Sequence, residues 1–258
     1  DKLISEDIIT IEDVLKIEKK YKSSLEKKLE NSKKDNNIEI TPFMDYEWKG
    51  FKRVKKDKML TNYETKVSNE NLTTVAKVVT TLPKNKQFLR KTKRLINDRS
   101  KMFFETDKID WGMGEMLAYG SLLNEGFNVR ISGQDVERGT FSHRHAILKV
   151  EDSEEEICLL NNINNNQGSF NIYNSHLSEY GVMGYEYGYS LTSPQTLCIW
   201  EAQFGDFSNG AQIMIEQYLS TAEDKWKLQN GLVLFLPHGY EGQGAEHSSA
   251  RMERYLQL

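Results

Sequence analysis

The stretch Thr196-Leu197-Cys198-Ile199-Trp200-Glu201-Ala202-Gln203-Phe204-Gly205-Asp206-Phe207 shows most directly how the chain is organised. It opens with a short, nearly continuous apolar run, which is typical of a strand that is buried on both faces of a sheet. Acidic, amide and aromatic side chains follow the run. That change predicts a strand that ends at about Trp200 and a polar loop that begins at Glu201.

The same pattern recurs along the second half of the chain. Further short strands are expected at residues 128–132, 170–173 and 232–236. Helices are expected at residues 111–124, from Ser178 to about residue 187, and at residues 209–221. Alternating strands and helices predict an α/β fold, with a mostly parallel sheet and helices on both faces. Ligands bind such sheets at the carboxyl ends of the strands, so the loops that begin at Gly133, Glu201 and Pro237 are the candidate sites.

Charge divides the chain into two regions. Residues 1–105 carry 25 Lys and Arg against 17 Asp and Glu, whereas residues 106–258 carry 9 against 21. We therefore expect a helical and irregular connecting region at 1–105, followed by the α/β domain at 106–258. In the first region, amphipathic periodicity predicts helices at 10–34 and 84–104, with Thr10 and Asp13 close to a capping box. Residues 31–75 are polar and are expected to be irregular.

Composition argues against several classes of protein. No apolar run approaches the ~18–20 residues of a membrane-spanning helix. Cys158 and Cys198 lie in apolar surroundings without a CxxC spacing, which argues against a disulfide scaffold or a thiolate zinc site. The basic run at 52–58 has no interleaved aromatic residues, and the net charge of the chain is −4, so nucleic-acid binding is not expected.

The three candidate loops contain residues that could carry chemistry. In the first loop, the spacing places His143 and His145 on one face of an extended chain. These two histidines could belong to a polar network, contact a substrate or form the start of a metal site. In the second, Phe204 and Phe207 could stack on a planar ligand or belong to the core. In the third, His247 precedes an expected helix and is either a proton carrier or a surface histidine. That loop is glycine-rich but has neither the Walker nor the dinucleotide spacing.

One carboxylate stands out beside these loops. Glu179 follows Ser178 at the expected start of a helix, where a negative charge is favourable in itself. Glycines recur in that helix at positions 181, 184 and 188, which would let another backbone approach closely.

Four blocks, in this order, together resemble one family: residues 132–146, 173–181, 199–207 and 236–251. The sequence resembles the thiamine-diphosphate-dependent first component of 2-oxoglutarate dehydrogenase, well over residues 80–258 and loosely before them. The resemblance implies a fragment of a longer chain that contains the transketolase-like pyrimidine-binding domain, truncated at its C-terminus. The family's magnesium and diphosphate motif, Gly-Asp-Gly to Asn, is absent and belongs to an upstream domain in that family. No metal ligand is therefore assigned in this chain.

The resemblance also implies roles for individual residues. Glu179 matches the glutamate that bonds N1′ of the aminopyrimidine and relays a proton there. Phe207, with Phe204 nearby, matches the aromatic residue that stacks on the ring, while Gln203 and the backbone of Leu177 are further cofactor contacts. His247 matches a catalytic histidine on the substrate side, where His143 and His145 also belong without individual roles.

The implied reaction is the oxidative decarboxylation of 2-oxoglutarate on thiamine diphosphate, with transfer of the succinyl group to a lipoyl carrier. The implied partners are a second copy of the chain, with the site at the subunit interface, and a lipoyl-bearing succinyltransferase. The expected location is the cytoplasm of a bacterium or the mitochondrial matrix of a eukaryote. Two alternatives are a related enzyme for 2-oxoadipate and a non-catalytic assembly module, because the fragment alone is not expected to turn over.

Overall fold

A computed structural model describes residues 2–34, 43–52, 54, 58, 61–106, 108–239 and 244–258. Part of the basic run, at 53 and 55–57, and part of the third candidate loop, at 240–243, lie outside the described residues. The chain forms two compact units, Asp1–Phe43 and Met44–Leu258.

The first unit is helical. It contains α1 (Lys2–Ser5) and α2 (Ile11–Lys34), and α2 buries none of its residues. The backbone N–H of Thr10 donates to the Asp13 carboxylate at 3.0 Å, and the N–H of Asp13 donates to the Thr10 hydroxyl at 3.1 Å. This reciprocal pair satisfies donors that the first turn leaves free and confirms the predicted start of the helix.

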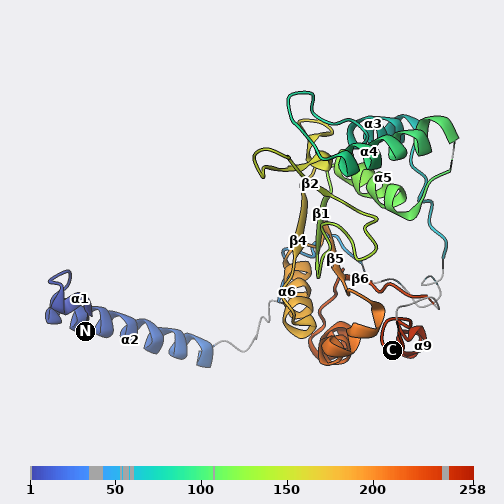
Figure 1. Ribbon diagram of the computed structural model, residues 1–258. Helices are drawn as coiled ribbons and strands as arrows, with labels where there is room; N and C mark the ends of the chain where they lie inside the picture. The colour runs from blue at the N-terminus through green and yellow to red at the C-terminus, as the bar shows by residue number, and fades with distance from the viewer. Residues whose placement is uncertain are drawn as a thin grey trace. The chain divides into compact units, whose positions relative to one another are not determined.

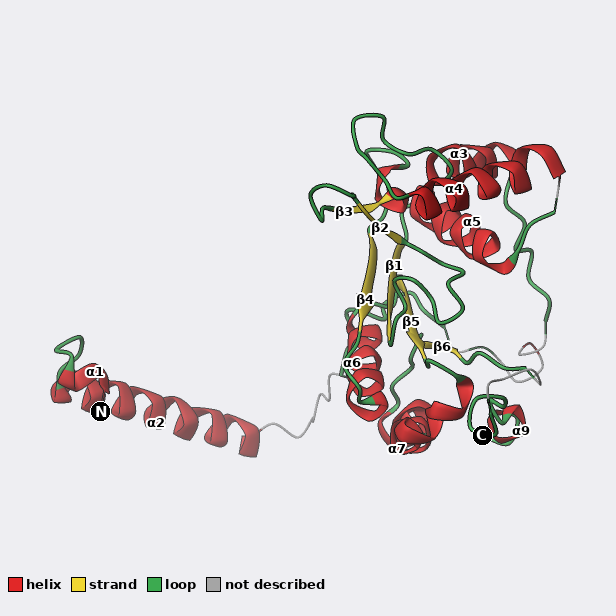
Figure 2. Cartoon of the chain, in the orientation of Figure 1, coloured by secondary structure: helices red, strands yellow, loops and turns green. Residues whose placement is uncertain are grey.

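The second unit is built on a parallel sheet of four strands (Figures 1 and 2). In spatial order they are β4 (Phe170–Asn174), β1 (Asn128–Gly133), β5 (Thr196–Glu201) and β6 (Val233–Phe235). All four predicted strands and the parallel sheet are confirmed.

Strand order locates the crevice of this sheet. The chain leaves β1 toward β4 on one side, and later strands continue from β1 on the other side through β5 to β6. The order therefore reverses between β1 and β5, and ligands of open α/β sheets bind outside the carboxyl ends of the strands at such a point. Gly133 pairs with Glu201 at this end, and a Cβ on Gly133 would lie 2.1 Å from the Glu201 carbonyl oxygen. Only glycine permits this approach.

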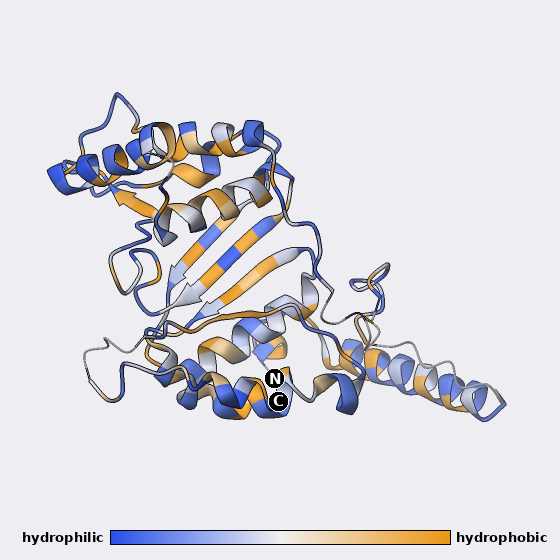
Figure 3. Ribbon diagram, turned by 90° about the vertical axis from the view of Figure 1, so that its right-hand side faces the viewer, coloured by the Kyte–Doolittle hydropathy of each residue, from blue (hydrophilic) through white to orange (hydrophobic). Residues whose placement is uncertain are grey.

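Helices cover both faces of the sheet (Figure 3). On one face α5 (Trp111–Asn124) packs on β1, with α3 (Asn69–Val79) beside it. On the other face α6 (Glu179–Thr192) packs on β5. Successive residues of β5 reach opposite faces, as the pleat requires: Ile199 joins the core under α5, and Trp200 joins the core with Met183 of α6.

Several elements differ from their sequence-based predictions. Helix α3 lies partly in the stretch predicted to be irregular; Ser68 caps it, accepting from the Asn71 N–H at 3.2 Å, and Val75, Ala76 and Val79 are buried. The helix was not predicted because its sequence is largely polar and its apolar face is narrow. Packing of this face against the rest of the unit stabilises the helix. The antiparallel pair β2 (Ile147–Lys149) and β3 (Glu156–Cys158) was also not predicted.

Other helix boundaries shift. The helix predicted at 84–104 is α4 (Arg90–Lys101), which a π-helical turn continues through Met102–Thr106. The predicted helix at 209–221 is divided into Gly205–Ala211 (3-10), α7 (Gln212–Met214) and Ile215–Leu219 (π), followed by α8 (Ala222–Trp226). A short helix, α9 (Met252–Tyr255), lies near the last residue. Within the described ranges, no helix has the length and apolar character needed to cross a membrane.

Candidate functional site

A pocket opens at the carboxyl ends of β1 and β5, where the strand order reverses. The pocket has a volume of about 180 Å³, part of which is open to solvent. Its lining residues are Gln134, Ser175, His176, Glu179, Trp200, Glu201, Ala202 and Gln203. Topology and side chains therefore point to the same place, and two of the candidate residues, Glu179 and Gln203, meet there.

The Glu179 carboxylate is held in a defined position. Glu179 is the first residue of α6, and the side chain of Ser178 caps that helix by accepting from the Gly181 N–H at 3.2 Å. Gln134 Nε2 donates to Glu179 Oε1 at 3.0 Å. On the other side, a Cβ added to Gly210 would lie 3.0 Å from Glu179 Oε2. One amide and one close backbone thus fix an acceptor at the edge of the pocket.

Aromatic rings gather in the loop after β5. The ring centroids of Phe204 and His247 lie 4.7 Å apart at 84°, and those of Phe207 and His247 lie 5.4 Å apart at 78°. Phe204 and Phe207 are half-buried and 6.4 Å apart, so neither is a fully buried core residue. Nδ1 of His247 is buried and has no hydrogen-bond partner among the described residues; Oε1 of Glu246 lies 3.6 Å from it.

The other candidate residues lie outside the pocket lining. Leu177 is 83% exposed and comes just before the capping Ser178. Phe141 lies between His143 and the aromatic group: its ring centroid is 6.1 Å from that of His143 and 5.7 Å from that of Phe204.

His143 and His145 do not share one environment. His143 Nε2 lies 3.5 Å from Glu115 Oε1. The N–H of His145 instead donates to the Arg138 carbonyl at 3.0 Å, and burial, with the charges of Arg99 and Arg138, lowers the pKa of His145. Among the residues that the structure describes, no group of three His, Cys, Asp or Glu side chains could hold a metal ion.

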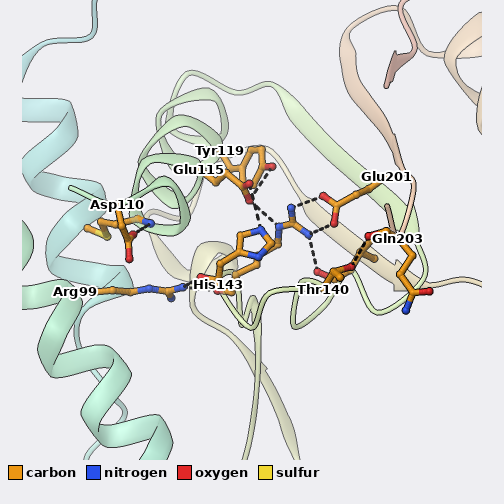
Figure 4. Close-up of polar contacts among 11 residues, drawn as sticks. Arg99, Asp110, Glu115, Tyr119, Thr140, His143, Glu201 and Gln203 are labelled. Carbon is orange, nitrogen blue, oxygen red and sulfur yellow. Dashed lines mark hydrogen bonds and ion pairs between the residues drawn. The ribbon is translucent and has the colours of Figure 1, made fainter. Parts of the chain in front are cut away.

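A buried ionic network lies beneath the first loop. Arg144 is 0% exposed. Its Nε donates to Glu115 Oε2 at 2.8 Å, its Nη1 donates to the Val136 carbonyl at 2.9 Å, and both Nη atoms bond the two carboxylate oxygens of Glu201. Figure 4 shows Glu115 of α5 and Glu201 of β5 on opposite sides of this network. The network joins a helix, a loop and a strand end.

Ionisation within the network follows from burial and pairing. Burial alone would raise the pKa of Glu115, but hydrogen bonds from His143 and Arg144 outweigh it, and the pKa is lowered. Arg99 donates to the His143 carbonyl at 3.1 Å and also to the Arg144 carbonyl. Burial lowers the pKa of Arg99 to about 10, so Arg99 stays charged at neutral pH.

The first loop is conformationally strained. Asp135, Ser142 and His145 have φ values of 54°, 53° and 41°, in the left-handed region that non-glycine residues rarely adopt. Such backbone costs on the order of 1 kcal/mol per residue and persists only where the surroundings enforce it. Strain of this kind gathers at functional sites.

The comparisons with known proteins agree with this geometry. The family model described as the pyrimidine-binding domain of transketolase matches residues 107–258. The chain belongs to this family. The resemblance to the first component of 2-oxoglutarate dehydrogenase and the α/β fold are both confirmed.

Named relatives extend the similarity over the whole chain. It is 48% identical to the mitochondrial 2-oxoglutarate dehydrogenase of Schizosaccharomyces pombe over 99% of its length, and 46% identical to that of Saccharomyces cerevisiae over 100%. It is 43% identical to the 2-oxoglutarate dehydrogenase E1 component of Haemophilus influenzae over 100%. The matches cover 26%, 26% and 27% of those three proteins, so this pyrimidine-binding domain and its lead-in span about a quarter of each.

Sequence reasoning missed several residues of the site, and three of them matter most for its geometry. Gln134 stands directly after Gly133 at the end of β1, which is a signal for a pocket residue at a strand end. Arg144 stands between His143 and His145, and the H-x-H spacing pointed to those two residues instead. Glu115 lies on a largely apolar helix, and no local pattern connects it with a loop that is distant in the sequence.

Proposed function

We propose that this chain supplies the pyrimidine-binding part of a thiamine-diphosphate site in the first component of 2-oxoglutarate dehydrogenase. That enzyme is an oxidoreductase that decarboxylates 2-oxoglutarate and passes the succinyl group to a lipoyl carrier. One observation carries the proposal: the carboxylate of Glu179 lies in a pocket at the strand-order reversal, bonded by Gln134 at 3.0 Å.

The side chains present fit an aminopyrimidine. Glu179 would hold a proton at N1′ of the ring, and Gln134 would keep the carboxylate oriented toward it. Phe204 and Phe207 offer half-buried ring surface for stacking, and Gln203 and the Leu177 backbone offer polar contacts at the edge. When bound, the cofactor supplies the electron sink for decarboxylation, and the protein supplies position and electrostatics.

The openness of the pocket supports a shared site. Its space of about 180 Å³ includes open solvent, so these side chains do not enclose a ligand by themselves. We infer that a second surface closes over the ligand. We assign this surface, with the ligands for magnesium and the diphosphate, to another domain of a homodimer, and the acyl acceptor to a lipoyl-bearing succinyltransferase.

The substrate side falls to the histidines. His247 packs against both phenylalanines, and its side chain is partly exposed. An exposed part of the imidazole can donate to or accept from a substrate carboxylate or keto oxygen. His143 and His145 belong to the first loop and would act at the periphery. His247 is therefore the catalytic candidate on this side.

The test uses the full-length protein with Glu179→Gln, which keeps the size of the side chain and removes its charge. Decarboxylation is measured with magnesium, thiamine diphosphate and an artificial electron acceptor, on 2-oxoglutarate, 2-oxoadipate and pyruvate. A lost general acid–base group lowers turnover by ~10²–10⁴-fold, and we expect a loss in this range. Glu156→Gln, which removes only an exposed ion pair with Lys149, is the matched control and should keep full activity.

Each outcome has a defined meaning. Turnover of the Glu179→Gln variant within twofold of the parent would overturn the role of Glu179. Preference of the parent for 2-oxoadipate would keep the cofactor and change the substrate. A parent that neither binds thiamine diphosphate nor turns over any of the three acids would refute the proposed function.

A further inference from the structure

Arg144 is the most completely buried cation of the described residues, and it contacts three separate segments. Its guanidinium bonds Glu115 on α5, the Val136 carbonyl in the first loop and both oxygens of Glu201 at the end of β5. This use of the planar fork requires arginine, because a lysine ammonium is a single point and cannot reach two carboxylates and a carbonyl in this geometry.

Two of the segments that Arg144 joins, the first loop and the end of β5, reach the pocket. The first loop sends Gln134 to Glu179 at 3.0 Å, and its Thr140 hydroxyl donates to the Gln203 carbonyl at 3.0 Å. Figure 4 shows Thr140 beside Gln203, on the side of the network where Glu201 lies. Glu201 leads directly into Gln203 and the aromatic residues after it. A change in the Arg144 bridge would therefore move both the partner of Glu179 and the start of the aromatic loop.

The strain in the first loop shows that something must hold it. Left-handed φ values occur at Asp135 and Ser142, on either side of the Val136 carbonyl that Arg144 bonds, and at His145 next to Arg144 itself. A loop released from these contacts would relax toward ordinary backbone angles and carry Gln134 away.

We propose that Arg144 is a positioning residue for the site, and that the Glu115–Arg144–Glu201 bridge holds the first loop and the end of β5 in the geometry that the cofactor requires. The inference rests on the proposed function. Arg144 lies outside the pocket lining and acts through Gln134, Thr140 and Glu201.

The chain contains a matched control for stability. Arg130 of β1 makes a second bidentate pair, with Glu186 of α6, at 2.7 and 2.8 Å. This pair faces Tyr173, Tyr185 and Tyr189 and bonds no residue of the first loop. Arg130→Lys therefore removes the same kind of interaction from the same sheet.

The experiment compares Arg144→Lys and Arg130→Lys in the full-length protein. Three quantities are measured: the thermal midpoint, the Kd for thiamine diphosphate with magnesium by tryptophan fluorescence, and the amide hydrogen exchange of residues 134–145 and 203–207. We expect both variants to lower the midpoint. Only Arg144→Lys should accelerate hydrogen exchange in the two segments. Only this variant should also raise the Kd for thiamine diphosphate, by about tenfold, because a shift of site residues by a fraction of an ångström is enough to weaken binding to that extent.

A double-variant cycle separates positioning from general weakening. If Arg144 acts through the end of β5, Arg144→Lys and Gln203→Ala affect one contact system, and their losses in cofactor affinity should be non-additive. If Arg144 only stabilises the fold, the losses should add. Should Arg144→Lys fail to fold, Glu201→Gln, which keeps the shape of the strand end and removes its charge, takes its place in every measurement.

The inference is overturned if Arg144→Lys and Arg130→Lys change Kd and exchange equally, or if the losses with Gln203→Ala add. The exchange measurement needs no cofactor, so it decides the structural part by itself. A parent without affinity for thiamine diphosphate overturns the proposed function, and with it the cofactor part of this inference. A binding parent with equivalent arginine variants overturns the inference alone.

Discussion

Replacing Gly210 by alanine should damage the site while leaving the fold intact. A Cβ at this position would lie 3.0 Å from Glu179 Oε2, but 3.4 Å from Glu179 Cβ and 3.5 Å from its Cδ. Only the carboxylate oxygen is too close, and it ends a flexible side chain. The carboxylate therefore has to give way by a few tenths of an ångström, whereas the backbone around Gly210 can remain in place.

The magnitude follows from the contact that this shift disturbs. The Gln134 bond to Glu179 Oε1 measures 3.0 Å, and hydrogen bonds weaken as the donor and acceptor move apart or out of line. A misplacement of 1 Å can cost ~10²-fold in rate, so a shift of a few tenths should cost about tenfold, equivalent to ~1.4 kcal/mol of transition-state stabilisation. Folding stability should hold or rise by about 0.4–1 kcal/mol, because alanine restricts the unfolded chain.

The assay measures kcat/KM on 2-oxoglutarate and urea unfolding of the same full-length preparation. Gly188→Ala is the control, because nothing lies within 4 Å of a Cβ at that position of α6. It should keep its activity and gain stability in the same range. Two results would refute the reasoning: Gly210→Ala activity within twofold of the parent, or a loss of activity that follows a comparable loss of stability.

Two further predictions concern the fold around the site. Gly133→Ala should abolish folding of the domain, since its Cβ would lie 2.1 Å from a backbone oxygen of β5 that cannot move; a soluble product with native circular dichroism would contradict this. The pKa of Glu115 is lowered in the folded protein, so its ionised carboxylate stabilises the fold. This stabilisation is fully present at pH values above 4.5, the ordinary pKa of a glutamate, and is lost as the pH falls below that value. In the Glu115→Gln variant, the urea midpoint should depend less on pH in this acidic range than it does in the parent. An unchanged dependence would count against the pairing of Glu115 with His143 and Arg144.

The sequence was sufficient for the four-stranded sheet because each of its strands contained its own signal. The run from Leu197 to Trp200 is apolar without interruption, and the acidic residue after it marked the end of β5 within one residue. Ser178 and Thr10 marked helix starts because capping chemistry is local. Helix α3 was missed because its apolar face is narrow, and that face is buried by residues distant in the sequence: Val75 packs in the core beside Gly120 of α5.

In the candidate site, too, residues with a signal in their own segment were found, and contacts between distant segments were missed. Glu179 and Gln203 could be named as candidates through the resemblance to the family, and the structure brings them to one pocket. Whether Phe204 and Phe207 stack on a ligand, and what His247, His143 and His145 contribute, stays a prediction. The Arg144 network could not be seen in the sequence because Glu115 and Glu201 are 29 and 57 residues away from Arg144 along the chain. No pattern within one segment encodes such a contact.

Topology gives the location of the site without any appeal to ancestry. The order β4-β1-β5-β6 places the crevice outside β1 and β5 for any sequence that folds this way. The chemistry then depends on which side chains end those strands, here Gln134 after β1 and Gln203 after β5, with Glu179 facing them from α6. A glutamate at a helix start needs no function to explain it. Glu179 is in addition bonded by the Gln134 amide and closely approached by the Gly210 backbone, and the first loop that supplies Gln134 is strained. Simple solvation of a carboxylate demands none of these arrangements, whereas the proposed role of Glu179 at a cofactor gives each of them a reason.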